Sequence, residues 1–257
     1  MKAKKSYGQH FLNKENIAKD IAESLTLMDQ YPDILEVGPG MGMLTKYLLQ
    51  HEEHQLKVVE ADGDMIVYLH QNYPQLIPHI IPQDFLKVKL DTLFDAQFAL
   101  IGNFPYNISS QILFKLLQYK TIIPEMVGMF QKEVAERVVA KPSTKAYGIL
   151  SVLLQAYFHT EYLFTVGPEC FTPPPRVQSA VIRLTRKDDY QSLGCDEKLF
   201  KTVVKTAFSM RRKMIRNTMK PFLPKELLFS DKFFEKRPDS IILEDYIKLT
   251  NIVAEHR

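Results

Sequence analysis

The sequence predicts an α/β fold: a doubly wound, largely parallel sheet with an antiparallel edge, followed by a small all-helical domain. Two observations support this prediction. In the first half of the chain, short apolar runs alternate with stretches of helical periodicity, which is the pattern of right-handed βαβ units. After residue 198, only helical patterns remain.

Strands are expected where short apolar runs stand between polar segments, because such runs are typical of strands buried on both faces. These runs are Asp33–Val37, Leu56–Glu60, His79–Ile81, Phe98–Gly102 and Met126–Phe130. Helices are expected where apolar residues recur at helical spacing. They do so at Ile17, Ile21, Leu25 and Met28, and again at Ile112, Leu113, Leu116 and Leu117.

Two further strand-like stretches, Tyr162–Val166 and Val177–Thr185, flank a Thr-Pro-Pro-Pro sequence at residues 172–175. Proline lacks the N–H group that a central strand needs. We therefore expect these stretches to pair as an antiparallel hairpin at the sheet edge. Residues 187–197 are polar and contain Gly194, which predicts a linker. The expected domains are thus an α/β domain over residues 1–187 and a helical domain over residues 198–257.

Composition excludes several classes of protein. The chain has 257 residues, of which 46% are hydrophobic and 25% charged, so a disordered or fibrous protein is not expected. Its two cysteines, Cys170 and Cys195, cannot form a disulfide scaffold, and no Cys/His spacing indicates a metal site. The chain shows neither a signal peptide nor a membrane-spanning run, so we expect it in the cytoplasm. A monomer is the default expectation for its oligomeric state.

A glycine-rich turn follows the first long strand, with Gly38, Gly40 and Gly42. Glycine permits positive φ angles and close approach of a ligand to the backbone. A dinucleotide-binding fingerprint requires glycine where Met43 stands, and the Gly-Lys-Ser/Thr ending of a P-loop is absent. The turn therefore favours a nucleoside cofactor without a pyrophosphate.

Two acids follow the next two strands. Glu60 ends the second apolar run, where a carboxylate can accept hydrogen bonds from both hydroxyls of a ribose. Asp84 follows the third run, where a side chain can bind an adenine amino group. Together with the glycine turn, these residues resemble the Rossmann-like class I methyltransferases, which implies S-adenosyl-L-methionine as the cofactor.

The sequence Asn103-Phe-Pro-Tyr106 follows the fourth strand and is similar to the motif of amino-methyltransferases that act on planar nitrogens. The Asn103 side-chain oxygen and the Pro105 carbonyl can accept the two N–H bonds of an adenine amine, which localises the nitrogen lone pair. Tyr106 offers a ring on which the base stacks, a contact of ~1–3 kcal/mol. No general base is required, because the methylated nitrogen is acidic enough to lose its proton to water.

Six blocks of sequence resemble the ribosomal RNA adenine dimethyltransferases, and the last resembles the small-subunit (16S) branch in particular. They are residues 4–12, 35–42, 103–109, 131–134, 171–179 and 208–217. The resemblance implies dimethylation at N6 of two adjacent adenosines near the 3′ end of 16S rRNA, within the immature small subunit during ribosome biogenesis. It also implies that residues 1–187 form the catalytic domain and residues 198–257 the RNA-binding domain.

The resemblance also implies site residues. His10 and Leu12 would border the cofactor, Gly38 would lie under its methionine part, Glu60 would hold the ribose and Asp84 the adenine. Asn103 would bridge cofactor and target base, and Phe171 would stack on the base opposite Tyr106. Two residues depart from the family pattern: His10 stands where asparagine is usual, and Phe104 replaces leucine.

The net charge of +3 conceals a segregation of charge. Nine basic and no acidic residues lie between Lys198 and Lys225, which leaves 24 basic and 30 acidic residues in the remainder. A one-signed segment of this kind favours phosphate binding. We expect RNA contacts from Arg211, Arg212, Lys213 and Arg216, and from a shorter patch at Lys2, Lys4 and Lys5.

Three alternatives remain open on the sequence. A DNA adenine methyltransferase would share the cofactor turn and the Asn-x-Pro-Tyr motif but would not explain residues 171–179 and 208–217. The branch that methylates large-subunit rRNA is disfavoured by the basic run at Arg211–Lys213. A non-catalytic ribosome-assembly or transcription factor is disfavoured by the intact Asn103 and Glu60.

Overall fold

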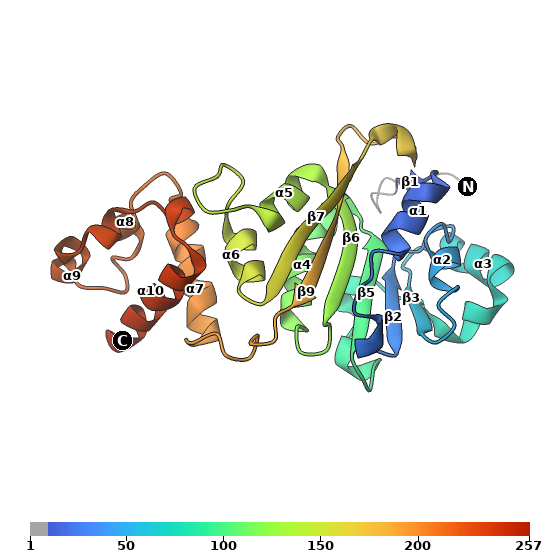
Figure 1. Cartoon of the computed structure of the whole chain (residues 1–257), viewed down its shortest axis with the longest axis horizontal. Coiled ribbons are helices and arrows are strands. Elements are labelled where there is room, and N and C mark those ends of the chain that lie inside the picture. Colours follow the sequence, from blue (N-terminus) through green and yellow to red (C-terminus); the bar gives the residue numbers. More distant parts are fainter. Residues whose placement is uncertain (1–9) are drawn as a thin grey trace. The chain divides into compact units, whose positions relative to one another are not determined.

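Seven strands form one mixed sheet in the computed structural model, which describes residues 10–257 (Figure 1). The strand order is β4-β3-β2-β5-β6-β9-β7. Strands β4 to β6 pair in parallel, β9 pairs antiparallel with β6, and β7 lies at the edge. The strands are β2 (Asp33–Val37), β3 (Gln55–Val59), β4 (Ile80–Ile81), β5 (Phe98–Asn103), β6 (Glu125–Gln131), β7 (Phe158–Val166) and β9 (Ser179–Arg186). The predicted parallel sheet with an antiparallel edge is confirmed.

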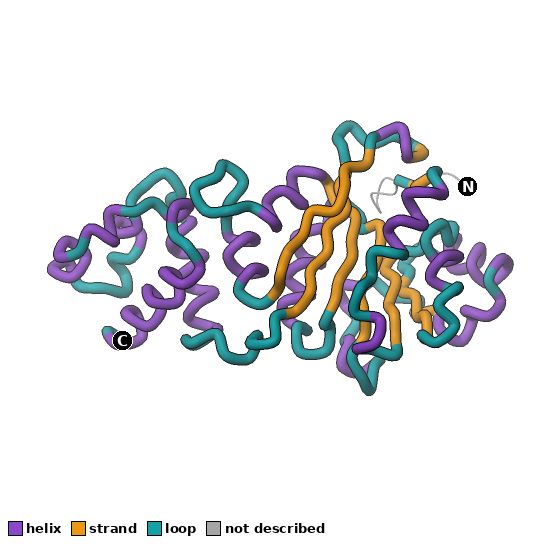
Figure 2. Tube along the Cα trace, in the orientation of Figure 1, coloured by secondary structure: helices purple, strands orange, loops and turns teal. Residues whose placement is uncertain are grey.

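Helices lie on both faces of the sheet and make up the C-terminal part of the chain (Figure 2). They are α1 (Glu15–Ala22), α2 (Thr45–Leu48), α3 (Gly63–Asn72), α4 (Ser109–Gln118), α5 (Lys132–Val139), α6 (Ile149–Gln155), α7 (Glu197–Phe208), α8 (Ile215–Thr218), α9 (Lys225–Ser230) and α10 (Leu243–Glu255). The predicted helix around Ile112–Leu117 is α4, in which Ile112, Leu113 and Leu116 are buried. No helix between residues 10 and 257 is long and apolar enough to cross a membrane.

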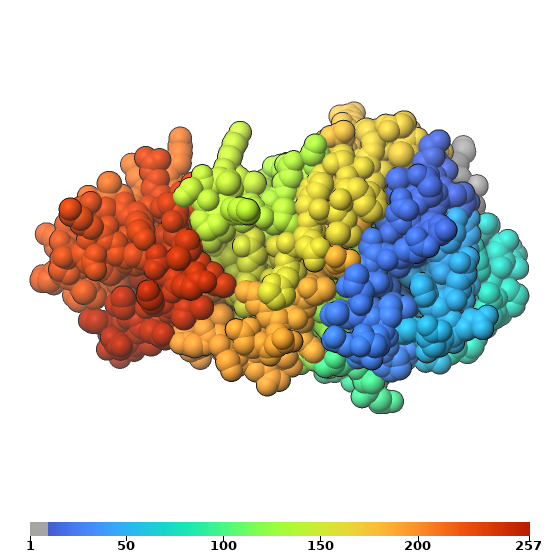
Figure 3. Space-filling view, viewed as in Figure 1, coloured from blue at the N-terminus to red at the C-terminus, as the bar shows by residue number. Residues whose placement is uncertain are grey.

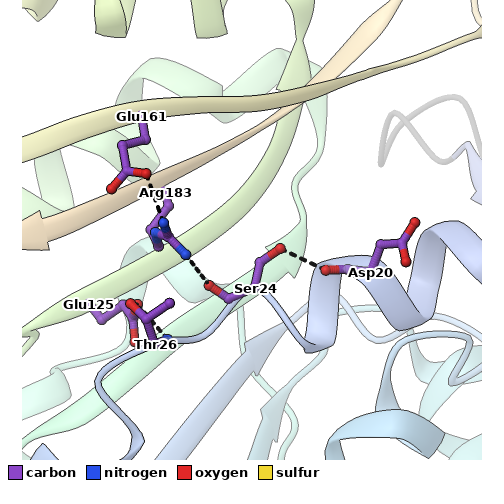
Figure 4. A network of polar contacts seen from close by, with 6 residues as sticks. All are labelled: Asp20, Ser24, Thr26, Glu125, Glu161 and Arg183. Atoms are coloured by element: carbon purple, nitrogen blue, oxygen red, sulfur yellow. Dashed lines mark hydrogen bonds and ion pairs between the residues drawn. The ribbon is translucent and has the colours of Figure 1, made fainter.

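One predicted helix is shorter than expected. The periodicity from Ile17 to Met28 predicts a continuous helix, but α1 ends at Ala22. The cause is the buried Glu125 carboxylate on β6, which accepts hydrogen bonds from the backbone N–H groups of Thr26 and Leu27 (Figure 4). Those N–H groups are therefore committed to a tertiary contact and not to a helical turn.

A second polar contact fixes the same segment. Arg183 on β9 donates to the Ser24 carbonyl at 3.0 Å and forms an ion pair with Glu161 on β7 at 2.7 Å (Figure 4). Ser24 in turn donates to the Asp20 carbonyl at 2.6 Å. The chain after α1 is thus tied to both β6 and β9.

A two-stranded sheet was not predicted. It pairs β1 (Phe11–Leu12) antiparallel with β8 (Phe171–Thr172), two segments far apart in the sequence. Asn13 extends this contact, since its N–H donates to the Cys170 carbonyl at 2.8 Å and its side chain donates to the Thr172 hydroxyl at 2.9 Å.

Contacts divide the chain into two compact units. The first takes in the described residues up to Ala135 together with Thr160–Arg186, and it holds most of the sheet. The second comprises Glu136–His159 and Lys187–Arg257 and contains α6 to α10. Residues 136–159 therefore group with the C-terminal helices, although the sequence analysis assigned them to the α/β domain.

Candidate active site

A cavity of about 810 Å³ opens beside the carboxyl ends of β2, β3 and β5. Its lining includes eight of the predicted cofactor and catalytic residues: His10, Leu12, Gly38, Glu60, Asp84, Asn103, Pro105 and Tyr106. The convergence follows from topology, because parallel strands deliver their carboxyl ends to one edge of a sheet.

The glycine turn forms one wall of this cavity. Gly38 has φ +66°, and a Cβ atom added there would meet no atom within 4 Å. The backbone at Gly38 therefore borders open space. At Gly42, in contrast, an added Cβ would lie 2.4 Å from the ring of Tyr73, whose hydroxyl donates to the Gly42 carbonyl at 3.0 Å. Gly42 shapes the turn by its packing, whereas Gly38 leaves room for a ligand.

Glu60 lies just past β3 and is 7% exposed. Its carboxylate accepts the N–H groups of Asp62 at 2.9 Å and Gly40 at 3.3 Å, so the side chain is held by the glycine turn itself. Burial raises the pKa of Glu60, although these N–H groups oppose the rise. Each carboxylate oxygen has a second lone pair with which to accept a further donor.

Asp84 is held by a short turn. Its carboxylate accepts the N–H of Leu86 at 3.0 Å. The ammonium group of the buried Lys115 on α4 donates to the Phe85 and Val88 carbonyls, which fixes the same turn from below. Burial lowers the pKa of Lys115, and the nearby Asp84 opposes that effect.

Sequence reasoning missed Glu36, an acid on β2 that lines the cavity and is 2% exposed. The Thr45 hydroxyl donates to it at 2.6 Å. Burial raises the pKa of Glu36 to about 8, although the hydrogen bond from Thr45 opposes the rise. The available signal was an acid inside an otherwise apolar strand, directly before the glycine turn.

The Asn-Phe-Pro-Tyr loop forms the opposite wall. The side-chain amide of Asn103 donates to the His10 carbonyl at 3.1 Å, which leaves its oxygen as the acceptor. The Pro105 carbonyl receives only long contacts, from the Ile108 N–H at 3.3 Å and the Ser109 hydroxyl at 3.4 Å. Both predicted acceptors thus border the cavity.

Tyr106 and His10 lie against one another. Their ring centroids are 5.3 Å apart with an interplanar angle of 29°. The Tyr106 hydroxyl shares a hydrogen bond with Ser179, and His10 Nδ1 lies 2.9 Å from the Pro173 carbonyl. Burial raises the pKa of the Tyr106 phenol.

Phe171 is not brought to the cavity wall. It lies in β8 opposite Leu12, is 3% exposed and packs in the hydrophobic core. A stacking contact with a substrate requires this ring to be uncovered, so its expected role stays a prediction.

Comparison with known proteins shows the family to which the chain belongs. The model of the family described as "Ribosomal RNA adenine dimethylase" matches residues 1–240. The chain belongs to the ribosomal RNA adenine dimethylase family. A relative named "Ribosomal RNA small subunit methyltransferase A" from Bacteroides thetaiotaomicron is 54% identical over 257 residues, covering 99% of this chain and 95% of that protein. A relative of the same name from Flavobacterium johnsoniae is 54% identical over 251 residues, covering 97% of this chain and 95% of that protein.

Solved structures share the fold. A dimethyladenosine transferase from Plasmodium falciparum has a TM-score of 0.81 at 23% identity and covers 96% of this chain and 98% of its own. The 23S rRNA methyltransferase ErmE has a TM-score of 0.70 at 22% identity and covers 95% of this chain and 99% of its own. The fold is therefore that of the class I methyltransferases.

S-adenosylmethionine is the cofactor of this dimethylase family, and two features of the cavity fit it. The backbone at Gly38 borders open space that a side chain would fill. Glu60 and Asp84 place carboxylates on the same cavity, where the ribose and adenine of a nucleoside offer donors. Among residues 10–257, no cluster of His, Cys, Asp and Glu is placed to hold a metal ion.

The four predicted RNA-binding residues of this dimethylase lie in the second unit and fall into two classes. Arg211 and Arg216 are engaged with their own chain, Arg211 by two hydrogen bonds and an ion pair and Arg216 by an ion pair. Arg212 and Lys213 are exposed. The predicted patch at Lys2, Lys4 and Lys5 lies outside the described residues.

Proposed function

We propose that this chain dimethylates N6 of two adjacent adenosines near the 3′ end of small-subunit (16S) rRNA, with S-adenosylmethionine as the methyl donor. The observation that carries the proposal is the Asn103–Tyr106 loop, which borders the same cavity as Gly38, Glu60 and Asp84, the residues predicted to bind the nucleoside. Family membership over residues 1–240 supports it.

Each residue of the loop has a defined task. Asn103 Oδ1 and the Pro105 carbonyl accept the N–H bonds of the target amine, which pyramidalises the nitrogen and localises its lone pair. Tyr106 supplies a stacking surface for the base once the His10 ring moves off the Tyr106 ring. Bound S-adenosylmethionine supplies an electrophilic methyl group. Because alignment is the main requirement, catalysis depends on how rigidly these groups are held.

The target base must leave its stack to reach this loop, at a cost of a few kcal/mol that is smaller in an RNA loop. Phe171 serves as the second stacking surface after β8 separates from β1. Residues 1–187 form the catalytic domain, residues 187–197 a linker and residues 198–257 the RNA-binding domain. The substrate is the immature small ribosomal subunit, and the chain acts as a monomer in the cytoplasm.

The test uses labelled S-adenosylmethionine and small subunits from a strain that lacks the modification. After digestion of the RNA, the expected product is N6,N6-dimethyladenosine. Asn103→Ala is expected to abolish most of the dimethyl product, whereas Asn72→Ala, on the exposed end of α3, serves as a matched control. Label that appears only in large-subunit RNA, only in DNA or nowhere refutes the proposal.

A further inference from the structure

The basic residue Arg211 contacts protein oxygens. Its guanidinium donates to the carbonyls of Thr144 at 3.2 Å and Lys145 at 2.7 Å, and it forms an ion pair with Asp239 at 3.6 Å. An arginine has five N–H donors in a fixed fork. Because these contacts occupy part of that fork, Arg211 joins two loops of its own unit and does not offer a free cation.

The loop held by Arg211 runs from residue 140 to residue 148 and connects α5 with α6. It has two further anchors: the Ser143 N–H donates to the Asp239 carbonyl at 2.7 Å, and the buried Tyr147 donates to the Ile241 carbonyl at 3.0 Å. The exposed Lys145 lies between these anchors, and the exposed Lys141 lies two residues before Ser143. The loop is therefore held over residues 143–147 while its lysines face solvent.

The loop after α7, residues 209–214, lies beside this first loop (Figure 1). It carries the exposed Arg212 and Lys213, and side chains of both segments project from the surface in the space-filling view (Figure 3). Neither loop contains an acid. Asp239, whose backbone carbonyl accepts the Ser143 N–H, is paired with Arg211 through its carboxylate.

Arg216, like Arg211, is engaged by groups of its own unit. It forms an ion pair with Glu235 at 3.4 Å and lies over the Phe229 ring at 5.0 Å from the centroid. Its charge is thus partly neutralised within the second unit.

We propose that Lys141 and Lys145 join Arg212 and Lys213 in one phosphate-binding surface for rRNA, here called the two-loop basic face, and that Arg211 is a positioning residue that holds the two loops together. This inference rests on the proposed function. Four cations on two anchored loops suit a polyanion, since pre-ordered contacts lose less conformational entropy on binding. Phosphate contacts of this kind set the position of the RNA and do not specify sequence.

The first test compares salt dependence. Binding of the full chain to unmodified small subunits is measured from 50 to 200 mM salt for the wild type and for the double variant Lys141→Gln/Lys145→Gln. We expect the magnitude of the slope of log K against log salt to fall by about 1 for each lysine. The matched control is Lys232→Gln/Lys248→Gln, which removes two exposed lysines of the same unit that lie outside the basic segment and is expected to keep the wild-type slope.

The same variants separate this inference from the proposed function. If dimethyladenosine forms, Lys141→Gln/Lys145→Gln is expected to raise KM for the subunit at least several-fold while kcat is unchanged at saturation. Wild-type KM and slope, with product still formed, overturn the two-loop basic face only. Absence of product with the wild-type chain overturns the proposed function.

A second test addresses Arg211. Arg211→Gln is expected to accelerate amide hydrogen exchange in residues 140–148, because the carbonyls of Thr144 and Lys145 lose their donor, and Arg211→Lys is expected to restore part of the protection. Arg212→Gln is expected to lower the salt slope by about 1 without changing that exchange. Unchanged exchange in Arg211→Gln refutes the positioning role.

Discussion

A methyl group added at Gly128 tests whether the packing beneath the Asn-Phe-Pro-Tyr loop sets the position of its two acceptors, Asn103 Oδ1 and the Pro105 carbonyl. Gly128 on β6 pairs in register with Gly102 on β5. The Phe104 ring lies across both glycines and stacks on Phe130, with centroids 4.9 Å apart. Phe104 is 1% exposed, and its N–H donates to the Met129 carbonyl at 3.1 Å. The ring is therefore confined from below and by its own backbone.

The magnitude follows from the available space. A Cβ at Gly128 would lie 2.4 Å from the Phe104 ring and 2.8 Å from the Phe130 ring. Overpacking of this kind costs about 1–3 kcal/mol of folding stability. Relief requires Phe104 to move outward, and the flanking Asn103 and Pro105 move with it. Since a shift of about 1 Å can cost ~100-fold in rate, we expect kcat of Gly128→Ala to fall about 10- to 100-fold.

The assay combines urea unfolding, binding of S-adenosylmethionine and steady-state methylation. Cofactor affinity is expected to change little in Gly128→Ala, because the glycine turn, Glu60 and Asp84 follow strands β2, β3 and β4, and not β5 or β6. The decisive variant is Gly128→Ala/Phe104→Leu, in which the shorter side chain makes room for the methyl group. We expect it to recover stability and kcat relative to Gly128→Ala, with a coupling of about 1–2 kcal/mol. Strictly additive losses in the double variant would refute the reasoning.

Three further outcomes are expected. Asn103→Ala is expected to slow the second methylation at least as much as the first, because the monomethyl amine keeps one N–H; mass spectrometry of the RNA should reveal monomethyladenosine, and equal slowing of both steps contradicts this. Glu36→Gln is expected to flatten the pH dependence of stability without cofactor. Glu36 has a pKa of about 8 in the folded chain, so it stays protonated to higher pH there than in the unfolded chain. As pH rises from 5 to 7, the free energy of unfolding of the wild type therefore falls by up to about 1.4 kcal/mol per pH unit. Parallel curves for variant and wild type argue against this contribution of Glu36. Glu125→Gln is expected to lower the free energy of unfolding in urea by about 2–4 kcal/mol, because the substitution replaces one acceptor oxygen with an NH2 donor that faces four donor groups. The exposed Glu53→Gln is the control. A loss below about 1 kcal/mol refutes this explanation.

The cavity was predictable from the sequence for a specific reason. Gly38, Glu60, Asp84 and Asn103 each lie at or just after the end of a strand, and the alternation of strands with helices fixes a parallel sheet. A parallel sheet then brings those strand ends to one edge without any knowledge of side-chain packing. Local patterns therefore sufficed to bring together residues that lie far apart in the chain.

Contacts made through side chains between distant segments were not predictable in this way. Glu125 binds Thr26 across 99 positions, and this contact ends a helix that periodicity alone would continue. Likewise, the His10 carbonyl accepts a hydrogen bond from the Asn103 side-chain amide across 93 positions. No local signal marks either partner, because an acid in a strand and a loop histidine have the same pattern whether or not a distant group meets them.

The basic run shows how the two kinds of information combine. Charge counted along the chain identifies the segment that can meet phosphate, but an arginine that binds carbonyls of its own protein has the same sequence signature as one that binds RNA. The partners of Arg211 lie 66 and 67 positions earlier, in a loop that carries lysines of its own. A contact that engages one cation with the protein therefore also brings the loop with Lys141 and Lys145 beside the basic run. The extent of the proposed basic surface follows from the tertiary structure and not from the length of the charge run.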